Sequence, residues 1–299
     1  MTKVISESKV TIIGLGLIGG SIALSLRGLG CEVTAFDENK ASLETGIKNG
    51  VIDLAALSIE DAVSDADLIL VAVPVLAMEG VFSAISHKFN QEQVVISDVG
   101  SVKAVGVKAL ETVFGSVPDN FVLAHPIAGS EKHGVAASDV SLFEGHQVII
   151  TPLQNTNEDC INLVNSMWRN LGAVVTQMAV SHHDHILAQT SHLPHLLAFA
   201  LVDTLSKQGD SLEVFDFAAG GLRDFSRIAA SDPRMWRDIF ESNREPILEI
   251  LDEYLNELSD IKSWMENGKS DEIFALLERA KQARDHFSQI LDKRSVPKK

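Results

Sequence analysis

The chain has 299 residues, of which 45% are hydrophobic and 22% are charged, enough apolar material for a packed core and no signature of disorder. Its formal net charge of −16 argues against nucleic acid or an anionic membrane surface as the main partner, because both repel an acidic protein. Cys31 and Cys160 form no CxxC pair, so we expect two buried thiols in a reducing cytoplasm and no disulfide framework.

The first predicted elements lie around an uncharged stretch, residues 10–26. This stretch is slightly shorter than a membrane-spanning helix, which needs about 20 apolar residues. A secretion signal would have basic residues before the apolar run and a small-residue cleavage site after it. Here Glu7 precedes the run and Arg27 ends it, so both interpretations are poor, and we expect no membrane association.

The same stretch has the pattern of a dinucleotide-binding βαβ unit. Residues 9–13 predict a buried strand, a GxGxxG motif begins at Gly14, and an apolar helix follows. The next predicted strand, residues 32–36, ends on Asp37. That acid lies 37 − 14 = 23 residues after Gly14, close to the spacing of about 20 expected for a carboxylate that binds the adenosine ribose.

Each glycine of the motif has its own expected role. Gly14 permits a tight turn, Gly16 lets the backbone approach a pyrophosphate, and Gly19 lets the helix pack close to the strand, while the helix amino terminus offers N–H groups to the phosphates. The predicted cofactor-binding residues of this domain are Gly14, Gly16, Leu17, Ile18, Gly19, Asp37, Val73, Pro74 and Ser101.

Asp37 also indicates which dinucleotide binds. Its carboxylate can accept hydrogen bonds from both ribose hydroxyls, whereas a 2′-phosphate would face it as a like charge. Glu38 and Asn39 come next, with no arginine to receive that phosphate. The sequence therefore predicts NAD and not NADP.

Alternation of strands and helices continues to about residue 178. Further strands are predicted at residues 67–73, 94–98, 121–124, 147–151 and 173–176. Such a rhythm predicts a mostly parallel sheet covered by helices. We therefore expect residues 1–178 to form a Rossmann-type α/β domain with a doubly wound sheet.

From residue 181 onward the pattern is helical only. Predicted helices cover residues 181–206, interrupted by Pro194, then run from Asp232-Pro233 through Leu255, and finally span residues 271–291. Residues 179–299 should thus form an all-α carboxyl-terminal domain. Because helices this apolar commonly bury one face against a second copy, we expect this domain to build a homodimer.

Two candidate sites lie where ligands bind such a sheet, outside the carboxyl ends of its strands. In the first, residues 98–103, Ser101 is placed to cap a helix and to reach a ligand. In the second, His125 at a strand's carboxyl end could serve as a general base near neutral pH. The alternative for His125 is an orienting histidine hydrogen-bonded within its loop.

The helical half contains further candidates. Ser191 and His195 are four residues apart, hence on one helix face. Five histidines between residues 182 and 195 suggest a metal, but the segment has no HExxH motif, no nearby cysteine and only Asp184 as a carboxylate, so no metal site is expected. After a predicted flexible joint at residues 220–221, Arg223 and Arg227 share a helix face and suit anion capture. The alternative is an ion pair with Asp224 or a dimer partner.

Taken in order, these motifs closely resemble the prephenate dehydrogenases, including the arogenate and cyclohexadienyl variants. The resemblance covers nearly the whole chain, and the motifs that carry it are GLGLIGGS from Gly14, DVGSVK from Asp98, HPIAGSEKHG from His125, the HD…SHLPH run over residues 183–195, and GGLRDFSRIAASDP from Gly220, with Trp236. The related β-hydroxyacid dehydrogenases share the architecture, but their lysine-centred motif is not evident.

The resemblance implies NAD-dependent oxidative decarboxylation of prephenate to 4-hydroxyphenylpyruvate, in tyrosine biosynthesis. It implies that His125 takes the proton of the 4-hydroxyl group, that Ser101 aligns this hydroxyl with the nicotinamide, and that Arg227 pairs with a substrate carboxylate. It places Ser191, His192 and His195 near the substrate, Glu131 and Arg223 at the entrance of the site, and Trp236 over the pocket. Alternatives are arogenate as substrate, another NAD-dependent β-hydroxyacid or imino-acid enzyme, and a non-catalytic NAD sensor.

Overall fold

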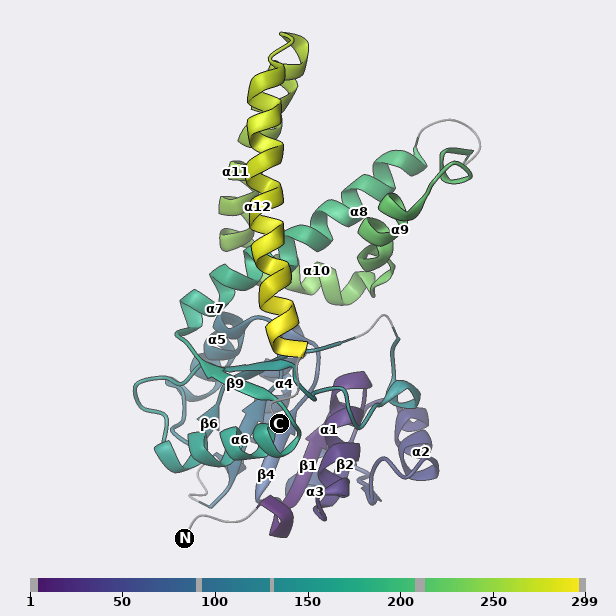
Figure 1. The fold of residues 1–299 in the computed structure, drawn as a ribbon. Coiled ribbons are helices and arrows are strands. Elements are labelled where there is room, and N and C mark those ends of the chain that lie inside the picture. Colours follow the sequence, from purple (N-terminus) through teal and green to yellow (C-terminus); the bar gives the residue numbers. More distant parts are fainter. Residues whose placement is uncertain (1–4, 90–92, 130–131, 208–212, 296–299) are drawn as a thin grey trace. The chain divides into compact units, whose positions relative to one another are not determined.

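The computed structural model describes residues 5–89, 93–129, 132–207 and 213–295, with side chains to residue 291. These residues divide into two compact units, residues 1–244 and 245–299, each described here by itself. In the first unit, helices cover a parallel sheet (Figure 1). Its sheet-covering helices are α1 (Leu17–Gly28), α2 (Lys40–Lys48), α3 (Ile59–Val63), α4 (Met78–Ala84), α5 (Lys103–Phe114) and α6 (Glu158–Asn170).

The main sheet has six parallel strands in the order β3-β2-β1-β4-β5-β6. They are β1 (Lys9–Ile13), β2 (Glu32–Phe36), β3 (Leu54–Ala55), β4 (Leu68–Val71), β5 (Val95–Asp98) and β6 (Phe121–Val122). This order is that of a doubly wound sheet, with its switch point between β1 and β4, so the predicted fold class is confirmed. Ligands of such sheets bind outside the carboxyl ends at the switch point.

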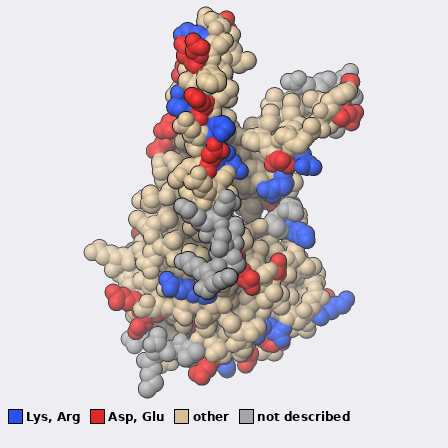
Figure 2. All heavy atoms as spheres, in the orientation of Figure 1, with Lys and Arg blue, Asp and Glu red and all other residues tan. Residues whose placement is uncertain are grey.

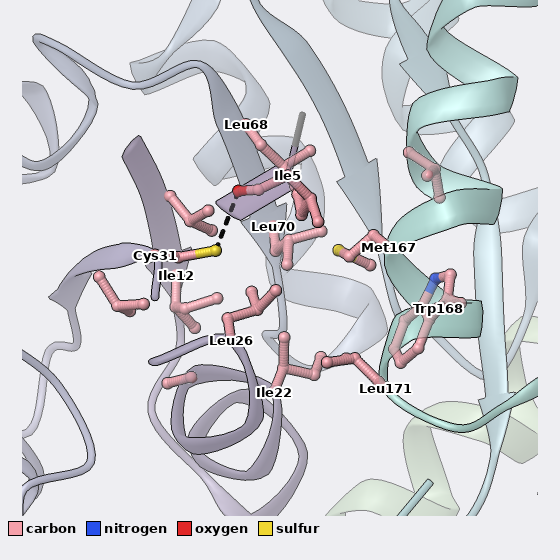
Figure 3. Close-up of a cluster of buried hydrophobic side chains, with 14 of the residues drawn as sticks. Ile5, Ile12, Ile22, Leu26, Cys31, Leu68, Leu70, Met167, Trp168 and Leu171 are labelled. Carbon is pink, nitrogen blue, oxygen red and sulfur yellow. Dashed lines mark hydrogen bonds between the residues drawn. The ribbon is translucent and has the colours of Figure 1, made fainter. Parts of the chain in front are cut away.

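The sheet is buried on both faces, and β4 shows how the sequence achieves this. Successive side chains of a strand point to opposite faces. Leu68 and Leu70 join one core cluster, together with residues of α1 and α6, while Ile69 and Val71 join a second cluster with residues of α4 and α5. Figure 3 shows part of the first cluster, in which the thiol of Cys31 donates to the carbonyl oxygen of Ile5 at 3.0 Å.

A second sheet contains β7 (Ala124–Ile127), β8 (Gln147–Ile150) and β9 (Val174–Gln177). In it β7 is antiparallel to β8, which is parallel to β9. The prediction of one strand at residues 121–124 with His125 at its carboxyl end was therefore wrong. Thr151 donates its N–H to the carbonyl oxygen of Leu123 at 2.9 Å, which draws the chain out of the parallel ladder, and His125 lies within β7, opposite Ile149.

The helical segment of the first unit follows β9. It contains α7 (Val180–Leu187), the π-helical turn η5 (Ala188–His192), α8 (Leu193–Ser206), α9 (Gly220–Ser226) and α10 (Pro233–Ser242). The interruption predicted at Pro194 is instead the π turn before it. Pro194 occupies the first turn of α8, where its missing N–H costs no helical hydrogen bond. Short 3₁₀ turns are η1 (Ile5–Glu7), η2 (Val75–Ala77), η3 (Ser86–Lys88), η4 (Val135–Ala137), η6 (Glu213–Phe215) and η7 (Arg227–Ala230).

Two details of this segment differ from the prediction. The residues predicted as a flexible joint, Gly220 and Gly221, begin α9. The helix predicted to continue from Pro233 through Leu255 ends at Ser242, and α11 (Arg244–Glu266) begins after Asn243. Asn243 interrupts the helix because its side-chain amide hydrogen-bonds the α7 and η5 segments.

The second unit consists of most of α11 together with α12 (Ser270–Ser295). Gly268, with φ +66°, lies in the turn between them, a conformation that favours glycine. On the face shown in Figure 2, acidic and basic side chains alternate along these helices. Large apolar side chains are also exposed on them, including Leu248, Leu255, Leu258, Met265, Phe274 and Leu277. Among the described helices, none is long and apolar enough to cross a membrane.

Candidate active site

The glycine loop after β1 has the geometry of a dinucleotide turn. Gly14 has φ +95°, and a Cβ at this position would lie 2.5 Å from the carbonyl oxygen of Ala72, so a larger residue would strain the turn. A Cβ on Gly19 would lie 2.0 Å from the carbonyl oxygen of Gly14. Only glycine at this position therefore allows α1 to lie so close to the loop after β1. By contrast, a Cβ on Gly16 would meet nothing within 4 Å, so the space above the loop is open to a ligand.

The amino terminus of α1 faces this loop without a side-chain cap, because its N-cap residue is Gly16. The first N–H groups of a helix have no intrahelical acceptor, so those of Leu17 and Ile18 are available to a phosphate. Val73 lies beside the loop, with Cγ1 3.0 Å from the Cβ position of Gly14, and Pro74 follows it after β4. These residues thus meet at the switch point of the sheet.

Asp37 stands directly after β2, at the same edge. Its Oδ2 accepts the N–H of Leu15 at 2.6 Å, and its Oδ1 accepts the N–H of Asn39 at 2.7 Å. The carboxylate is therefore held in place by backbone donors while remaining half-buried. Its remaining lone pairs suit the hydroxyls of a ribose, and the loop, helix terminus and acid together fit a dinucleotide.

A buried ion pair connects this edge of the sheet to His125. Lys103 Nζ lies 2.5 Å from Asp98 Oδ2 and 2.5 Å from the carbonyl oxygen of Ala124, and neither side chain of the pair is exposed. Asp98 also accepts the N–H of Ala124 at 3.2 Å and that of Gly100 at 2.9 Å. Burial lowers the pKa of Lys103, an effect that neighbouring Asp98 opposes.

His125 forms a chain of hydrogen bonds with the helical segment. Its Nδ1 lies 2.9 Å from Nε2 of His183, whose Nδ1 lies 2.7 Å from Oδ1 of Asp184. The carboxylate of Asp184 also accepts the N–H groups of Lys103 and Ala104, each at 2.8 Å. Asp184, and not Ser101 as predicted, therefore caps α5, because α7 brings an anion to the positive end of that helix.

This environment favours neutral imidazoles. Burial lowers the pKa of His125 well below 6.5, and electrostatic interactions with His183 and Lys103 lower it further. Burial also lowers the pKa of His183. For Asp184, burial acts to raise the pKa, but hydrogen bonds from His183 and from two backbone N–H groups outweigh it, so the pKa is lowered. The imidazole of His125 is thus neutral at physiological pH.

The π turn places two further predicted residues around Trp236. His192 is buried, and its Nδ1 lies 3.0 Å from Nδ2 of Asn243; burial lowers its pKa to about 4. His195 stacks on Trp236 with ring centroids 3.7 Å apart, and its Nδ1 lies 2.8 Å from the carbonyl oxygen of Ser191. Trp236 itself is buried against Val102, the residue that follows Ser101 in the sequence.

The predicted arginines differ in their surroundings. Arg227 is exposed and begins the 3₁₀ turn η7. Burial lowers the pKa of His195, and the charge of Arg227 lowers it further. Arg223 Nε lies 3.3 Å from Asp224 Oδ1 on exposed α9, the ion pair considered as the alternative. Because α9 ends between the two arginines, they do not share one α-helical face as predicted. Glu131 lies outside the described residues.

Asp98, Lys103 and His183 were not among the predicted site residues, although each lies within a motif typical of the resembled family. One signal was available, because Asp98 ends a strand that is otherwise uncharged and Lys103 begins the following helix. His183 lay among the five histidines that were considered for a metal site. Only the packing of α7 against α5 distinguishes it from exposed His182 and His185.

A doubly wound sheet with a glycine loop and a ribose-type carboxylate, next to a buried neutral imidazole, defines a dinucleotide-dependent oxidoreductase. The family model described as prephenate dehydrogenase, nucleotide-binding domain, matches residues 22–177, and the one described as prephenate dehydrogenase, dimerization domain, matches residues 179–279. The chain belongs to the prephenate dehydrogenase family and is an NAD-dependent oxidoreductase.

Known proteins resemble the chain over most of its length. A cyclohexadienyl dehydrogenase of Zymomonas mobilis is 34% identical, covering 92% of this chain and 94% of that protein. A prephenate dehydrogenase of Bacillus subtilis is 35% identical, covering 93% of this chain and 76% of that protein. The crystal structure of A. aeolicus prephenate dehydrogenase in complex with hydroxyphenyl propionate and NAD+ has a TM-score of 0.88 at 36% identity, covering 95% of this chain and all of that one.

Proposed function

We propose that this protein catalyses the NAD-dependent oxidative decarboxylation of prephenate to 4-hydroxyphenylpyruvate, a step of tyrosine biosynthesis, with His125 as the proton acceptor. The observation that carries the proposal is the neutral, buried imidazole of His125 in β7, the strand that directly follows the last strand of the nucleotide-binding sheet. The family membership and the aromatic carboxylate named with the A. aeolicus structure also support it.

The chain's own residues fit the cofactor. Gly14, Gly16 and the amino terminus of α1 would hold the pyrophosphate, and Asp37 would bind the ribose and disfavour a 2′-phosphate. Val73, Pro74 and Ser101 would line the nicotinamide side. When bound, NAD+ supplies the acceptor for the hydride that leaves C4 of the substrate.

A weak base is sufficient for this reaction. As C4 loses hydride and becomes carbonyl-like, its hydroxyl proton grows acidic and passes to His125. Carbon dioxide then leaves C1, and the electrons of that bond move through the ring to the oxygen at C4, which takes the proton back as the ring becomes aromatic. Since no net proton is released, His125 need only be neutral beforehand and hold the proton briefly. Its lowered pKa favours both the neutral imidazole at the start and the return of the proton at the end.

The substrate carboxylates require a cation in an acidic protein. Arg227, whose charge acts on His195, is the proposed carboxylate partner. Ser101 would align the 4-hydroxyl, Ser191, His192 and His195 would contact the ring or side chain, and Trp236 would cover the pocket. Arg223 and Glu131 remain proposed residues of the entrance.

Three further features belong to the proposal. We propose a functional boundary at residues 178/179, between a nucleotide-binding part and a helical part that forms a homodimer. The description of the second family model as a dimerization domain and the exposed apolar side chains of α11 and α12 support the dimer. We also propose a cytoplasmic location, which the two unpaired, buried thiols support.

The decisive experiment is a set of kcat/KM values for prephenate and for arogenate, each with NAD and with NADP, followed by formation of the reduced nicotinamide. We expect the highest value for prephenate with NAD. A higher value for arogenate would reassign the substrate within the family, whereas failure of both would refute the proposed function. Higher values with NADP would refute the role of Asp37.

A further inference from the structure

The carboxylate of Asp184 determines which nitrogen of His183 carries a proton. Its two oxygens accept the N–H groups of Lys103 and Ala104, and Oδ1 also lies 2.7 Å from His183 Nδ1. An ionised carboxylate has no hydrogen to donate, and two backbone donors at a helix amino terminus keep it ionised. The hydrogen of this contact must therefore belong to Nδ1 of His183.

The same logic carries over to His125. His183 is fully buried near the ammonium group of Lys103, so it is neutral, and a neutral imidazole with a proton on Nδ1 has a free lone pair on Nε2. That Nε2 lies 2.9 Å from Nδ1 of His125, which must then donate. Since His125 is also neutral, its own Nε2 carries no proton.

We propose that His183, held by Asp184, is a positioning residue that fixes His125 in the tautomer whose Nε2 is bare, so that Nε2 is the atom that takes the substrate's hydroxyl proton. This inference deepens the proposed function and rests on it. Without an acceptor at Nδ1, a neutral imidazole can carry its proton on either nitrogen, and the tautomer with hydrogen on Nε2 cannot act as the base.

The charges around His125 are compatible with transient protonation of its imidazole. When Nε2 becomes protonated, Nδ1 can continue to donate to His183, so the ring keeps its orientation. Burial and the charge of Lys103 disfavour the imidazolium, while Asp98 neutralises part of the field of Lys103 and Asp184 lies one residue beyond His183. The proton is therefore returned from Nε2 to the oxygen of the product when the ring becomes aromatic, and no oxidant beyond the hydride acceptor is needed.

The tautomer can be measured directly in the intact protein without substrate. In a long-range ¹H–¹⁵N correlation spectrum of protein labelled at histidine, protonated and bare ring nitrogens have distinct shifts, and the His125 signals are those lost in His125→Asn. We expect His125 and His183 each to carry hydrogen on Nδ1 with a bare Nε2. A hydrogen on Nε2 of His125 in the unliganded protein would overturn the proposal.

Substitutions test the consequence for catalysis. His183→Phe keeps an aromatic ring but removes the acceptor, and should lower kcat on the order of 10- to 10³-fold, less than the roughly 10⁴-fold loss seen when a triad histidine is held in the wrong tautomer, with little change in KM. His183→Gln offers an amide oxygen to Nδ1 and should recover much of the loss. His182→Phe, exposed on the same helix, is the matched control and should retain wild-type kcat.

The outcomes separate the two proposals. If His183→Phe folds and retains wild-type kcat, or if His183→Gln is as impaired as His183→Phe, the positioning role is wrong. If the wild-type protein oxidises neither prephenate nor arogenate, the proposed function fails instead, while the tautomer measured by NMR remains informative about the hydrogen-bonded chain itself.

Discussion

The Nζ atom of Lys103 lies 2.5 Å from Oδ2 of Asp98, and both side chains are fully buried. The pair connects the end of β5 to the start of α5 and, through the carbonyl oxygen of Ala124, to the residue before His125. A buried ion pair is costly to break, because removal of one partner leaves an uncompensated charge in a low-dielectric interior.

From this pair we expect that Lys103→Met lowers the free energy of unfolding by about 3–5 kcal/mol, measured by urea denaturation. The double variant with Asp98→Asn should recover part of the loss, since no charge remains buried. Lys207→Met, which breaks an exposed pair with Asp203, is the control and should change stability little. Equal, small effects of both single variants would contradict a structural role for the buried pair.

Replacement of the proposed base should act on turnover. We expect His125→Asn to lower kcat by about 10²–10⁴-fold, the usual contribution of a general base, with KM for prephenate nearly unchanged. Steady-state kinetics check this, with His182→Asn as a control on exposed α7 surface. Near-normal turnover in His125→Asn would remove His125 from the mechanism.

The pH profile should differ from that of an ordinary histidine. The base works unprotonated and its pKa lies well below 6.5 because of burial and nearby positive charge, so activity is present above this lowered pKa and is lost as pH falls through it. We therefore expect kcat/KM to stay level through pH 6.5 and to decline only at clearly lower pH, whereas an unperturbed imidazole would give a midpoint near 6.5. An acid limb centred at 6.5 or above would contradict this burial argument.

Loss of the proposed carboxylate partner should act on substrate affinity. Arg227→Ala removes a charge-assisted hydrogen bond worth roughly 1.5–3 kcal/mol, which corresponds to about a 10- to 150-fold increase in KM with a smaller effect on kcat. Arg169→Ala, on the exposed side of α6, is the matched control. If KM is unchanged in Arg227→Ala, another cation anchors the substrate.

Assembly can be tested through the exposed apolar side chains of the second unit. Leu255 is 52% exposed in the isolated chain, and a dimer through the helical part would cover such residues. Leu255→Glu combined with Leu258→Glu should therefore convert dimers to monomers in size-exclusion chromatography with light scattering. Leu57→Glu, at a 94% exposed leucine of the first unit, should leave the dimer intact. A wild-type monomer, or a dimer that persists in the double variant, would refute this interface.

The local order of residues was enough to predict the dinucleotide-binding half. Gly14, Gly19 and Asp37 lie within one βαβ unit, and their roles depend on backbone geometry that neighbouring residues impose. Short continuous apolar runs likewise identified the main strands, because a strand buried on both faces has to be apolar throughout. The helical character of the carboxyl-terminal part followed from its spacing in the same way.

What the sequence alone could not reveal was which distant groups share hydrogen bonds. His125 and His183 are 58 residues apart, and Asp184 caps a helix whose first residue is 81 positions away. The break between β6 and β7 and the helix end at Asn243 have the same origin, since each involves a hydrogen bond to another segment. Periodicity reports which face of an element is buried, whereas the partner of a buried polar group is decided only when the elements pack together.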